Sequence, residues 1–301
     1  MQHPLVSIVV ISYNQRKYIK ENLDSLKAQT HLNWELIVAD DASQDGSAEE
    51  FKNWLKENQI SAKEIYHQKN TGLATVLNEA IELCEGKYVK FIAADDYLHP
   101  ECLEKSVKIL EEKGDDYGMV FTDFYPVNDN GEHVDFPLYY EDKDFFNQDS
   151  SLKNDQLSKY NCIIAPTTLV KKTAILSTGK YDPRILLEDH HRWLMINENF
   201  KIHFINKKLA YYRVLPTSVT GTRHERMLEE DIYLRMKYDK NGFNKAQILD
   251  FILSRYRNRL NLPDFIINEY AQYPFRKKLL SFALKNLHPT IYRYISKIYK
   301  K

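Results

Sequence analysis

Two pairs of adjacent aspartates stand where predicted β-strands end. Asp40 and Asp41 follow the apolar run at 34–39, and Asp95 and Asp96 follow another such run. In an open α/β sheet, ligands bind at the carboxyl ends of the strands. Four crowded carboxylates repel one another unless a cation or a hydrogen-bond donor is present, and a divalent metal that carries a diphosphate suits hard oxygen ligands. The two pairs together therefore predict a nucleotide-diphosphate site. For a single pair, helix capping or turn formation is the open alternative.

A third acidic pair, Glu188 and Asp189, opens a predicted helix that runs to about Asn199. A helix N-terminus attracts carboxylates through its dipole, so simple capping is one explanation of the pair. Two histidines follow directly, but adjacent positions on a helix point about 100° apart, and His190 and His191 cannot easily share a zinc ion. Zinc is therefore not expected here.

The elements that must hold these residues alternate regularly over the first 125 residues. Short β-branched runs are separated by stretches whose apolar residues have helical spacing, and Asn14 stands where it can cap the first helix. Strands are expected near 5–11, 34–39, 63–67, 88–93 and 119–125, and helices near 14–28, 47–58, 73–84 and 100–113. This alternation predicts an α/β fold with a mostly parallel sheet and helices on both of its faces.

The pattern is less regular after residue 126. A turn is predicted at 128–131, and the polar and aromatic residues at 139–160, which have no clear period, predict an ordered loop or a mobile lid. Regular structure returns at 161–170, with a helix at 188–199 and strands near 201–205 and 209–214. Beyond 221 the chain is expected to be helical, with breaks at Gly242, Pro263, Pro274 and Pro289.

The composition is that of an ordinary globular protein. Of 301 residues, 43% are hydrophobic and 28% are charged, with 42 basic against 42 acidic side chains, and no repeat or low-complexity block occurs. Apolar stretches stay well below the roughly 18 residues of a membrane span, and the first residues lack a signal-peptide charge pattern, so we expect a cytosolic protein. Cys84, Cys102 and Cys162 lack the spacing of a zinc site and are expected to be reduced.

The chain resembles the family 2 glycosyltransferases of the GT-A fold over about residues 4–220. The resemblance rests on the order and spacing of several motifs. These are 6–14, 34–47 with its Asp-Asp-Ala-Ser centre, Asn70-Thr71-Gly72 with Asn78, 86–89 leading to Asp95 and Asp96, Glu188 with Asp189, and Tyr212-Arg213 with Ser218. The resemblance implies a GT-A catalytic domain at 1–220, with a nucleotide-binding half at 1–98 and an acceptor-binding half at 99–220, followed by a helical region at 221–301.

The resemblance also implies which residues bind the donor. Asp41 would accept the N3 proton of a uracil or thymine ring, and Ser12, Tyr13 and Asn14 would line the nucleoside pocket. Asn70 would belong to the same donor site. A nucleotide-sugar donor is the expected small-molecule partner.

Asp95 and Asp96 match the acidic motif that holds Mg²⁺ or Mn²⁺ on the diphosphate in this family. The common family form is Asp-x-Asp-Asp, and Ala93 stands where its first aspartate would be. We therefore expect metal ligation to rest mainly on Asp96, with Asp95 beside it on the ribose or on a water near the metal.

The family's general base matches Asp189, with Glu188 as its neighbour in the motif. This base removes the proton of the acceptor hydroxyl, and attack opposite the diphosphate inverts the anomeric carbon. Arg213 and Ser218 would approach the leaving diphosphate, where cationic and hydroxyl donors stabilise negative charge. Leu215 replaces the usual histidine of that segment, and a solvated surface position is the alternative for Arg213.

The resemblance implies an inverting, metal-dependent hexosyl- or N-acetylhexosaminyltransferase that moves a sugar from a UDP-sugar to a hydroxyl of a growing cell-surface glycan. A nucleotidyltransferase is disfavoured, because Ser12-Tyr13-Asn14-Gln15 stands where a Gly-rich phosphate loop would follow the first strand. A catalytically silent glycan-binding or scaffold protein is a further alternative. The net acidic body, without a basic and aromatic module, disfavours nucleic-acid binding.

Residues 251–301 differ in charge from the rest of the chain. They hold eleven Lys and Arg against two Asp and Glu, mixed with aliphatic and aromatic residues at helical spacing. A segment of this kind, too short and too charged to span, suits a helix that lies on an anionic membrane. It would bring the site to a lipid-linked acceptor at the inner face of the cell membrane. Packing on the catalytic domain or formation of a homodimer is the equally open alternative.

Overall fold

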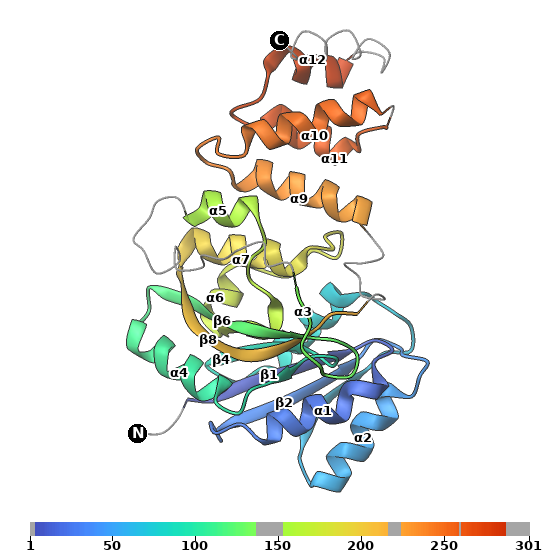
Figure 1. Ribbon diagram of the computed structural model, residues 1–301, viewed down its shortest axis with the longest axis vertical. Helices are drawn as coiled ribbons and strands as arrows, with labels where there is room; N and C mark the ends of the chain where they lie inside the picture. The colour runs from blue at the N-terminus through green and yellow to red at the C-terminus, as the bar shows by residue number, and fades with distance from the viewer. Residues whose placement is uncertain (1–3, 137–152, 216–223, 259, 287–301) are drawn as a thin grey trace. The chain divides into compact units, whose positions relative to one another are not determined.

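The structure, a computed structural model, describes residues 4–136, 153–215, 224–258 and 260–286 (Figure 1). The chain divides into two compact units. The first unit comprises residues 1–150 and 162–218 and contains the sheet; the second comprises 151–161 and 219–301, and its described elements are helices.

The first unit is built on one eight-stranded sheet with the order β3-β2-β1-β4-β7-β6-β8-β5. Its strands are β1 (Val6–Ser12), β2 (Trp34–Asp40), β3 (Ala62–Tyr66), β4 (Tyr88–Ala93), β5 (Tyr97–Leu98), β6 (Tyr117–Val127), β7 (Thr168–Lys171) and β8 (Lys201–Arg213). β1 runs parallel to β2 and β4, β2 to β3, and β6 to β8. β7 is antiparallel to both β4 and β6, and β5 to β8. The mostly parallel sheet predicted from the sequence is confirmed.

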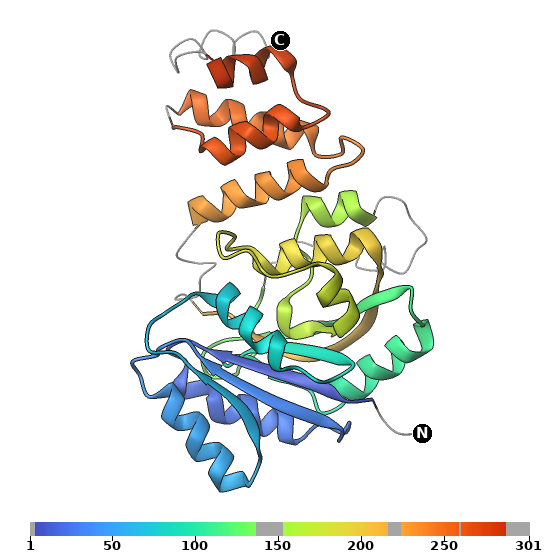
Figure 2. The ribbon, with the colours of Figure 1, turned by 180° about the vertical axis from the view of Figure 1, so that it is seen from behind.

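Helices cover both faces of this sheet (Figures 1 and 2). They are α1 (Arg16–Lys27), α2 (Ser47–Asn58), α3 (Leu73–Leu83), α4 (Cys102–Lys113), α6 (Lys172–Ser177) and α7 (Glu188–Asn199), with a 3₁₀ turn at Ala165–Thr167. Successive strand residues point to opposite faces, and β1 is buried on both, so it is apolar apart from the buried Ser7 and Ser12. Val6, Ile8 and Val10 pack in one core with residues of α1, α2 and α4, and Val9 serves the opposite face.

Two local predictions are wrong. Asn14 does not cap the first helix, because α1 begins at Arg16 and Gln15 occupies the cap position. Asn14 instead has a φ of 56°, a left-handed conformation that asparagine tolerates better than most residues. The strands expected at 201–205 and 209–214 are one strand, β8. The exposed polar residues 206–208, whose composition indicated an interruption, stay in β8, and the register against β6 shifts on both sides of Asp123.

The loop or lid expected at 139–160 is partly corrected. Lys153–Lys159 form the helix α5, and residues 139–152 lie outside the described residues. The second unit contains α5 together with α9 (His224–Tyr238), α10 (Lys245–Arg257), α11 (Asp264–Gln272) and α12 (Lys278–Asn286). The predicted helix breaks at Gly242, Pro263 and Pro274 are confirmed, while Pro289 lies outside the described ranges.

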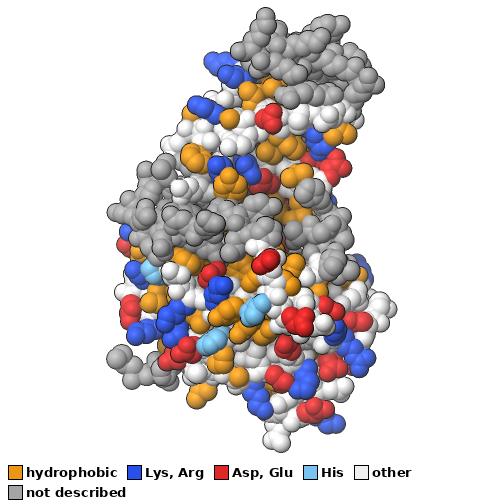
Figure 3. Space-filling view, viewed as in Figure 1, with side chains coloured by type: hydrophobic (Ala, Val, Ile, Leu, Met, Phe, Trp, Pro, Cys, Tyr) orange, Lys and Arg blue, Asp and Glu red, His pale blue; other side chains and the backbone are white. Residues whose placement is uncertain are grey.

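The second unit has an apolar core of its own, to which Ile248, Ile252 and Leu280 contribute. Asp239 holds its turns together, because its carboxylate accepts from the Asn244 backbone N–H (2.9 Å) and from the Tyr273 hydroxyl (2.5 Å). Orange apolar and blue basic side chains lie beside one another on the face of this unit seen in Figure 3. Across the described residues, no helix combines the length and the apolar character needed to cross a membrane.

Candidate functional site

Three neighbouring strands end at the same edge of the sheet, and candidate residues stand at their ends. Ser12 ends β1, Asp40 ends β2, and Asp95 follows the end of β4 by two residues. β1 lies between the other two and is parallel to both. Backbone hydrogen bonds continue the pairing past the strand ends, from Asp41 N to Ser12 O (3.1 Å) and from Ala94 N to Ile11 O (2.9 Å). The parallel sheet thus brings the two aspartate pairs to one edge.

The loops after β1 and β2 are joined by hydrogen bonds through Asn14. Its Oδ1 accepts from the Gln44 backbone N–H, and its own backbone N–H donates to Ser43 Oγ, each at 2.8 Å. Ser12 is fully buried, and no partner among the described residues lies within hydrogen-bond distance of its Oγ. Tyr13, by contrast, is 51% exposed. The joined loops form a platform that presents an aromatic ring.

Asp40 shapes the turn after β2. Its Oδ1 accepts from the Ser43 backbone N–H (2.9 Å), and its Oδ2 accepts from Ser43 Oγ (2.5 Å). This is the side-chain-to-backbone pattern of an Asx turn. The turn-forming alternative therefore holds for Asp40, which leaves its neighbour to be explained separately.

Asp41 binds the loop that follows β3. Its Oδ1 accepts from the Thr71 backbone N–H (2.8 Å) and lies 2.7 Å from His67 Nδ1, and its Oδ2 accepts from the Gly72 backbone N–H (2.8 Å). Burial acts to raise the pKa of Asp41, but the hydrogen bonds from Thr71, His67 and Gly72 outweigh it and lower the pKa. The side chain is an ionised, almost fully buried acceptor that holds the Asn70-Thr71-Gly72 loop beside the β1 and β2 loops.

His67 bridges two carboxylates. Its Nδ1 faces Asp41, and its Nε2 lies 2.8 Å from Oε2 of Glu79 on α3. Burial acts to lower the pKa of His67, but Asp41 and Glu79 together raise it above the usual histidine value. The protonated form, which donates from both ring nitrogens, is thus the form that this site favours.

Asp95 and Asp96 form a crowded acidic pair. Burial raises the pKa of Asp95, and burial with the neighbouring Asp95 charge raises the pKa of Asp96 well above its usual range. Two carboxylates that repel one another in a buried place fit a divalent cation, which Mg²⁺-type sites hold with one or two protein carboxylates plus substrate phosphates. Within the described ranges, no group of three or more His, Cys, Asp or Glu side chains could hold a metal ion.

Arg213, the last residue of β8, is buried behind this pair. Its backbone N–H donates to Asp96 Oδ1 (2.9 Å), and its Nε donates to the Asp95 carbonyl (2.9 Å). Nη1 donates to the carbonyls of Asn128 (2.7 Å) and Asp129 (2.9 Å), and Nη2 pairs with Glu21. The solvated surface alternative for Arg213 is wrong, since the side chain is 1% exposed. In this structure the guanidinium joins the Asp95 loop to the 128–129 turn and to α1.

Glu188 and Asp189 lie half-buried in the first turn of α7. Leu187 holds the cap position and makes no side-chain cap bond. The phenol of Tyr212 is affected by Asp189 and by the acidic pair. Burial raises the pKa of this phenol, and the charges of Asp96, Asp95 and Asp189 raise it further. One phenol therefore lies in the field of the acidic pair after β4 and of the acidic residue on α7.

Asn70, another predicted donor residue, is exposed directly before Thr71. The predicted donor residue Ser218 lies outside the described residues. Sequence reasoning did not assign site roles to His67, Glu79 and Tyr212. His67 is the last residue of the strand predicted near 63–67, and this position was a usable signal, because it places the ring at the same sheet edge as Asp41.

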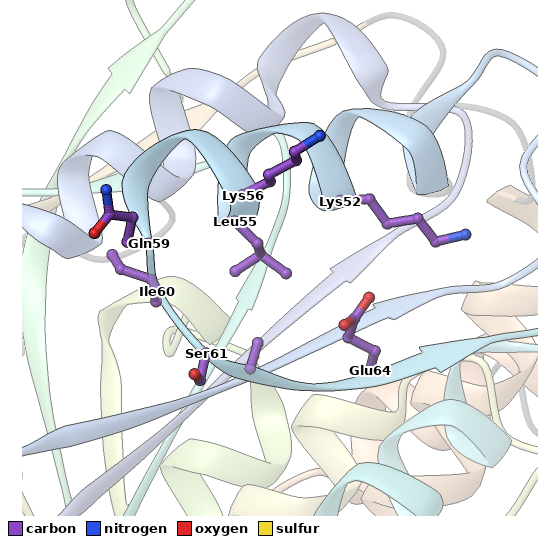
Figure 4. Close-up of a pocket in the computed structure, with 8 residues that line it drawn as sticks. Lys52, Leu55, Lys56, Gln59, Ile60, Ser61 and Glu64 are labelled. Carbon is purple, nitrogen blue, oxygen red and sulfur yellow. The ribbon is translucent and has the colours of Figure 1, made fainter.

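A pocket of about 520 Å³ lies elsewhere, between α2 and β3 (Figure 4). Residues 59–62 line it at the amino end of β3. The aspartates after β2 and β4 follow the carboxyl ends of parallel strands, at the opposite edge of the sheet. The candidate site is therefore defined by its charged groups and loops, and not by this pocket.

The chain matches the protein-family model described as Glycosyl transferase family 2 over residues 7–165. Among curated proteins, the putative teichuronic acid biosynthesis glycosyltransferase TuaG of Bacillus subtilis is 29% identical over 224 residues, which are 73% of this chain and 83% of that protein. The UDP-Glc:alpha-D-GlcNAc-diphosphoundecaprenol beta-1,3-glucosyltransferase WfaP of Escherichia coli is 26% identical over 240 residues, or 77% and 86% of the two chains.

Solved structures share the fold. TarS of S. aureus in complex with UDP matches with a TM-score of 0.62 and 19% identity, covering 98% of this chain and 91% of that chain. The mannosyltransferase PcManGT of Pyrobaculum calidifontis, in complex with GDP-Man and Mn²⁺, matches with a TM-score of 0.56 and 16% identity, covering 99% and 80%. These likenesses show that the sheet and its helices have the GT-A arrangement.

Proposed function

Because this chain belongs to glycosyl transferase family 2, we propose that it is an inverting glycosyltransferase that moves a sugar from a UDP-sugar to a hydroxyl of a growing cell-surface glycan. The observation that carries the proposal is the meeting of Asp41 with Asp95 and Asp96 at the carboxyl edge of the parallel sheet, where Arg213 binds Asp96 Oδ1 (2.9 Å). An acidic pair suited to a metal on a diphosphate, at the same sheet edge as a loop platform suited to a nucleoside, is what transfer from a nucleotide sugar requires.

The nucleoside is assigned to the platform formed by the loops after β1, β2 and β3. Tyr13 offers an exposed ring there, and Ser12 offers a buried hydroxyl. Asp41 is ionised and accepts hydrogen bonds at this platform, which suits the N3 proton of uracil, with Asn14 and Asn70 on the adjoining loops. The TarS structures with UDP and UDP-GlcNAc share the fold and support this choice of donor.

Asp96 and Asp95 would hold Mg²⁺ or Mn²⁺ against the donor diphosphate. The bound cation would supply charge stabilisation to the leaving nucleotide. Arg213 orients the two carboxylates, because it binds Asp96 Oδ1 and the Asp95 carbonyl. Ser218 is assigned to the diphosphate from the sequence motif alone.

Asp189 is assigned as the general base. It accepts the proton of the acceptor hydroxyl while that oxygen bonds to the anomeric carbon and the bond from that carbon to the diphosphate breaks. Attack from the face opposite the leaving group inverts the configuration. Glu188 precedes it in the first turn of α7.

The acceptor is proposed to be lipid-linked, as the name of the E. coli relative states for that protein. The second unit carries a surface suited to anionic lipid. Leu279 and Phe282 of α12 are 53% and 60% exposed, and Phe275 in the turn before this helix is 38% exposed, while Leu280 and Leu284 of α12 face the core. The exposed lysines Lys277, Lys278 and Lys285 stand beside them. Exposed apolar side chains with surrounding cations complement an anionic membrane surface, and we assign the protein to the inner face of the cell membrane.

The experiment that tests the function is a panel of nucleotide sugars, screened for metal-dependent release of the nucleoside diphosphate. UDP release that needs Mg²⁺ or Mn²⁺, and that is lost in the Asp96→Ala variant, is the expected result. Full activity with EDTA present would remove the metal from the proposal. Binding of glycan without turnover of any donor would instead identify a catalytically silent glycan-binding protein.

A further inference from the structure

One side chain of α3 holds the segment that leads to α7. Asn78 Oδ1 accepts from the Tyr181 backbone N–H (2.7 Å), and Asn78 Nδ2 donates to the Tyr181 carbonyl (3.0 Å). The two residues are 103 positions apart in the chain. A primary amide that both donates to and accepts from one residue fixes the position and the orientation of that backbone. Figure 2 shows α3 and the segment before α7 on the same face of the sheet.

Tyr181 in turn contacts α7 itself. The guanidinium of Arg192 lies over its ring, with Cζ 3.8 Å from the ring centroid, and Phe91 of β4 meets the ring edge-on at 6.5 Å. Arg192 is fully buried and donates to the Gly179 carbonyl (2.7 Å). Arg192 stands three residues after Asp189, which is about one helical turn. The two hydrogen bonds between Asn78 and Tyr181, called the Asn78 clasp below, are thus linked through Tyr181 and Arg192 to the first turn of α7.

Charge at Tyr181 supports this proximity. Burial raises the pKa of the phenol, Arg192 acts to lower it, and Glu188 and Asp189 act to raise it. The ring therefore lies in the field of the acidic pair on one side and of Arg192 on the other.

The helix α3, which carries Asn78, also begins at the nucleotide platform. α3 starts at Leu73, directly after Thr71 and Gly72, whose backbone N–H groups bind Asp41. Asn78 is five residues after Leu73, or about 7.5 Å along the helix at helical rise. One short helix therefore carries the loop that holds Asp41 and the amide that holds the segment before Asp189.

We propose that Asn78 is a positioning residue of the transfer reaction, which orients Asp189 toward the acceptor through Tyr181 and Arg192. This inference rests on the proposed role of Asp189 as the base. A role of this kind affects the chemical step and not the binding of the donor, because the clasp touches the segment before the base and leaves the Asp41 contacts in place.

The first test is Asn78→Ala, with kcat, donor KM, UDP affinity and thermal midpoint measured in the full chain. We expect kcat to fall about 10- to 100-fold, as misplacement of a reacting group does, with donor KM and UDP affinity unchanged. The matched control is Lys180→Ala. Lys180 and Glu82 form an ion pair (2.8 Å) between the same helix and the same segment, but their side chains are 75% and 63% exposed. This control should keep the wild-type kcat.

The second test is Asn78→Asp, which also decides the question if Asn78→Ala does not fold. The ionised side chain would still accept from the Tyr181 N–H but would set a carboxylate against the Tyr181 carbonyl. Protonation restores a donor, so the ratio of the variant's kcat to the wild-type kcat should rise as the pH falls. A ratio that is constant with pH would overturn the inference.

The outcome for Asn78 is distinguishable from the outcome for the proposed function. If Asp189→Asn loses turnover while Asn78→Ala keeps the wild-type kcat, the positioning role is wrong and the base assignment stands. If Asp189→Asn keeps full turnover, the base assignment itself fails. Equal losses of kcat and UDP affinity in Asn78→Ala would indicate general disruption and would also contradict the inference.

Discussion

Asp189 is the residue on which the chemistry depends. Substitution by asparagine keeps the size of the side chain but removes its ability to accept a proton. We expect the Asp189→Asn variant to lose roughly 10²- to 10⁴-fold in turnover, the usual contribution of a general base, with little change in UDP affinity. Steady-state kinetics with isothermal titration of UDP separates the two quantities. Loss of donor affinity with turnover retained at saturation would make Asp189 a binding residue.

His67 gives the nucleotide platform a pH dependence with a definite sign. Its pKa in the folded protein is raised by Asp41 and Glu79. The stabilisation from the protonated ring is therefore fully present below the ordinary histidine pKa and is lost as the pH rises through the raised value. The difference in unfolding free energy between wild type and His67→Gln should shrink over that rise. Denaturant titrations across the range measure it, and a difference independent of pH would contradict the bridge between the two carboxylates.

The site was partly predictable at this scale. Aspartates directly after neighbouring parallel strands meet at one sheet edge for geometric reasons, so their meeting follows from the sequence pattern. The contacts of Arg213 do not follow from the sequence pattern, because Glu21 lies 192 residues away in the chain and Asn128 lies 85 residues away. Only the folded chain shows which carbonyls a guanidinium will meet.

At the scale of elements, Arg213 connects β8, the loop after β4, the 128–129 turn and α1. Arg213→Lys keeps the charge but has no planar fork with which to bind several acceptors. We expect a loss of about 1–3 kcal/mol in unfolding free energy, because buried carbonyls lose their donors. Urea denaturation measures it. If the variant keeps wild-type stability and loses only donor affinity, the guanidinium acts on the diphosphate, as the sequence motif indicates.

Elements with one strong period were the most predictable. α7 and β4 have the predicted bounds, because acidic residues start the helix and an apolar run defines the buried strand. β8 was misjudged because its middle residues are polar. A strand can keep such residues where they are exposed, and only the pairing with β6 shows that the strand continues there.

At the scale of the molecule, the basic second unit should bind anionic vesicles. We expect co-sedimentation of the full chain with vesicles that contain an anionic phospholipid, and weakening by salt, because the lysine attraction is screened. The double substitution Leu279→Glu and Phe282→Glu should abolish binding. Leu32→Glu is the matched control, since Leu32 is 81% exposed in the first unit, and it should bind like wild type. A dimer in solution with no vesicle affinity would favour self-association over membrane docking.

The units themselves divide the chain less simply than the sequence pattern suggests. We expected one boundary at 220, whereas the compact units meet in the chain at 150/151, 161/162 and 218/219. The sequence carries no signal that the chain enters the second unit at 151–161, because α5 is short. Its membership of the second unit shows in the bond between Asn244 Nδ2 and Ser158 Oγ (2.8 Å), which joins residues 86 positions apart.

The membership of α5 in the second unit has consequences for inheritance and for engineering. A helical unit assembled from two separate stretches cannot be exchanged between relatives by one crossover after 218, because the recombinant would combine one parent's α5 with the other parent's α9 and α10. Ser158 and Asn244 would then come from different lineages. A chimera should therefore fold and work only when residues 151–161 and the stretch after 218 come from the same parent. For the same reason, substitutions on α5 should be inherited jointly with those on the helices that follow 219.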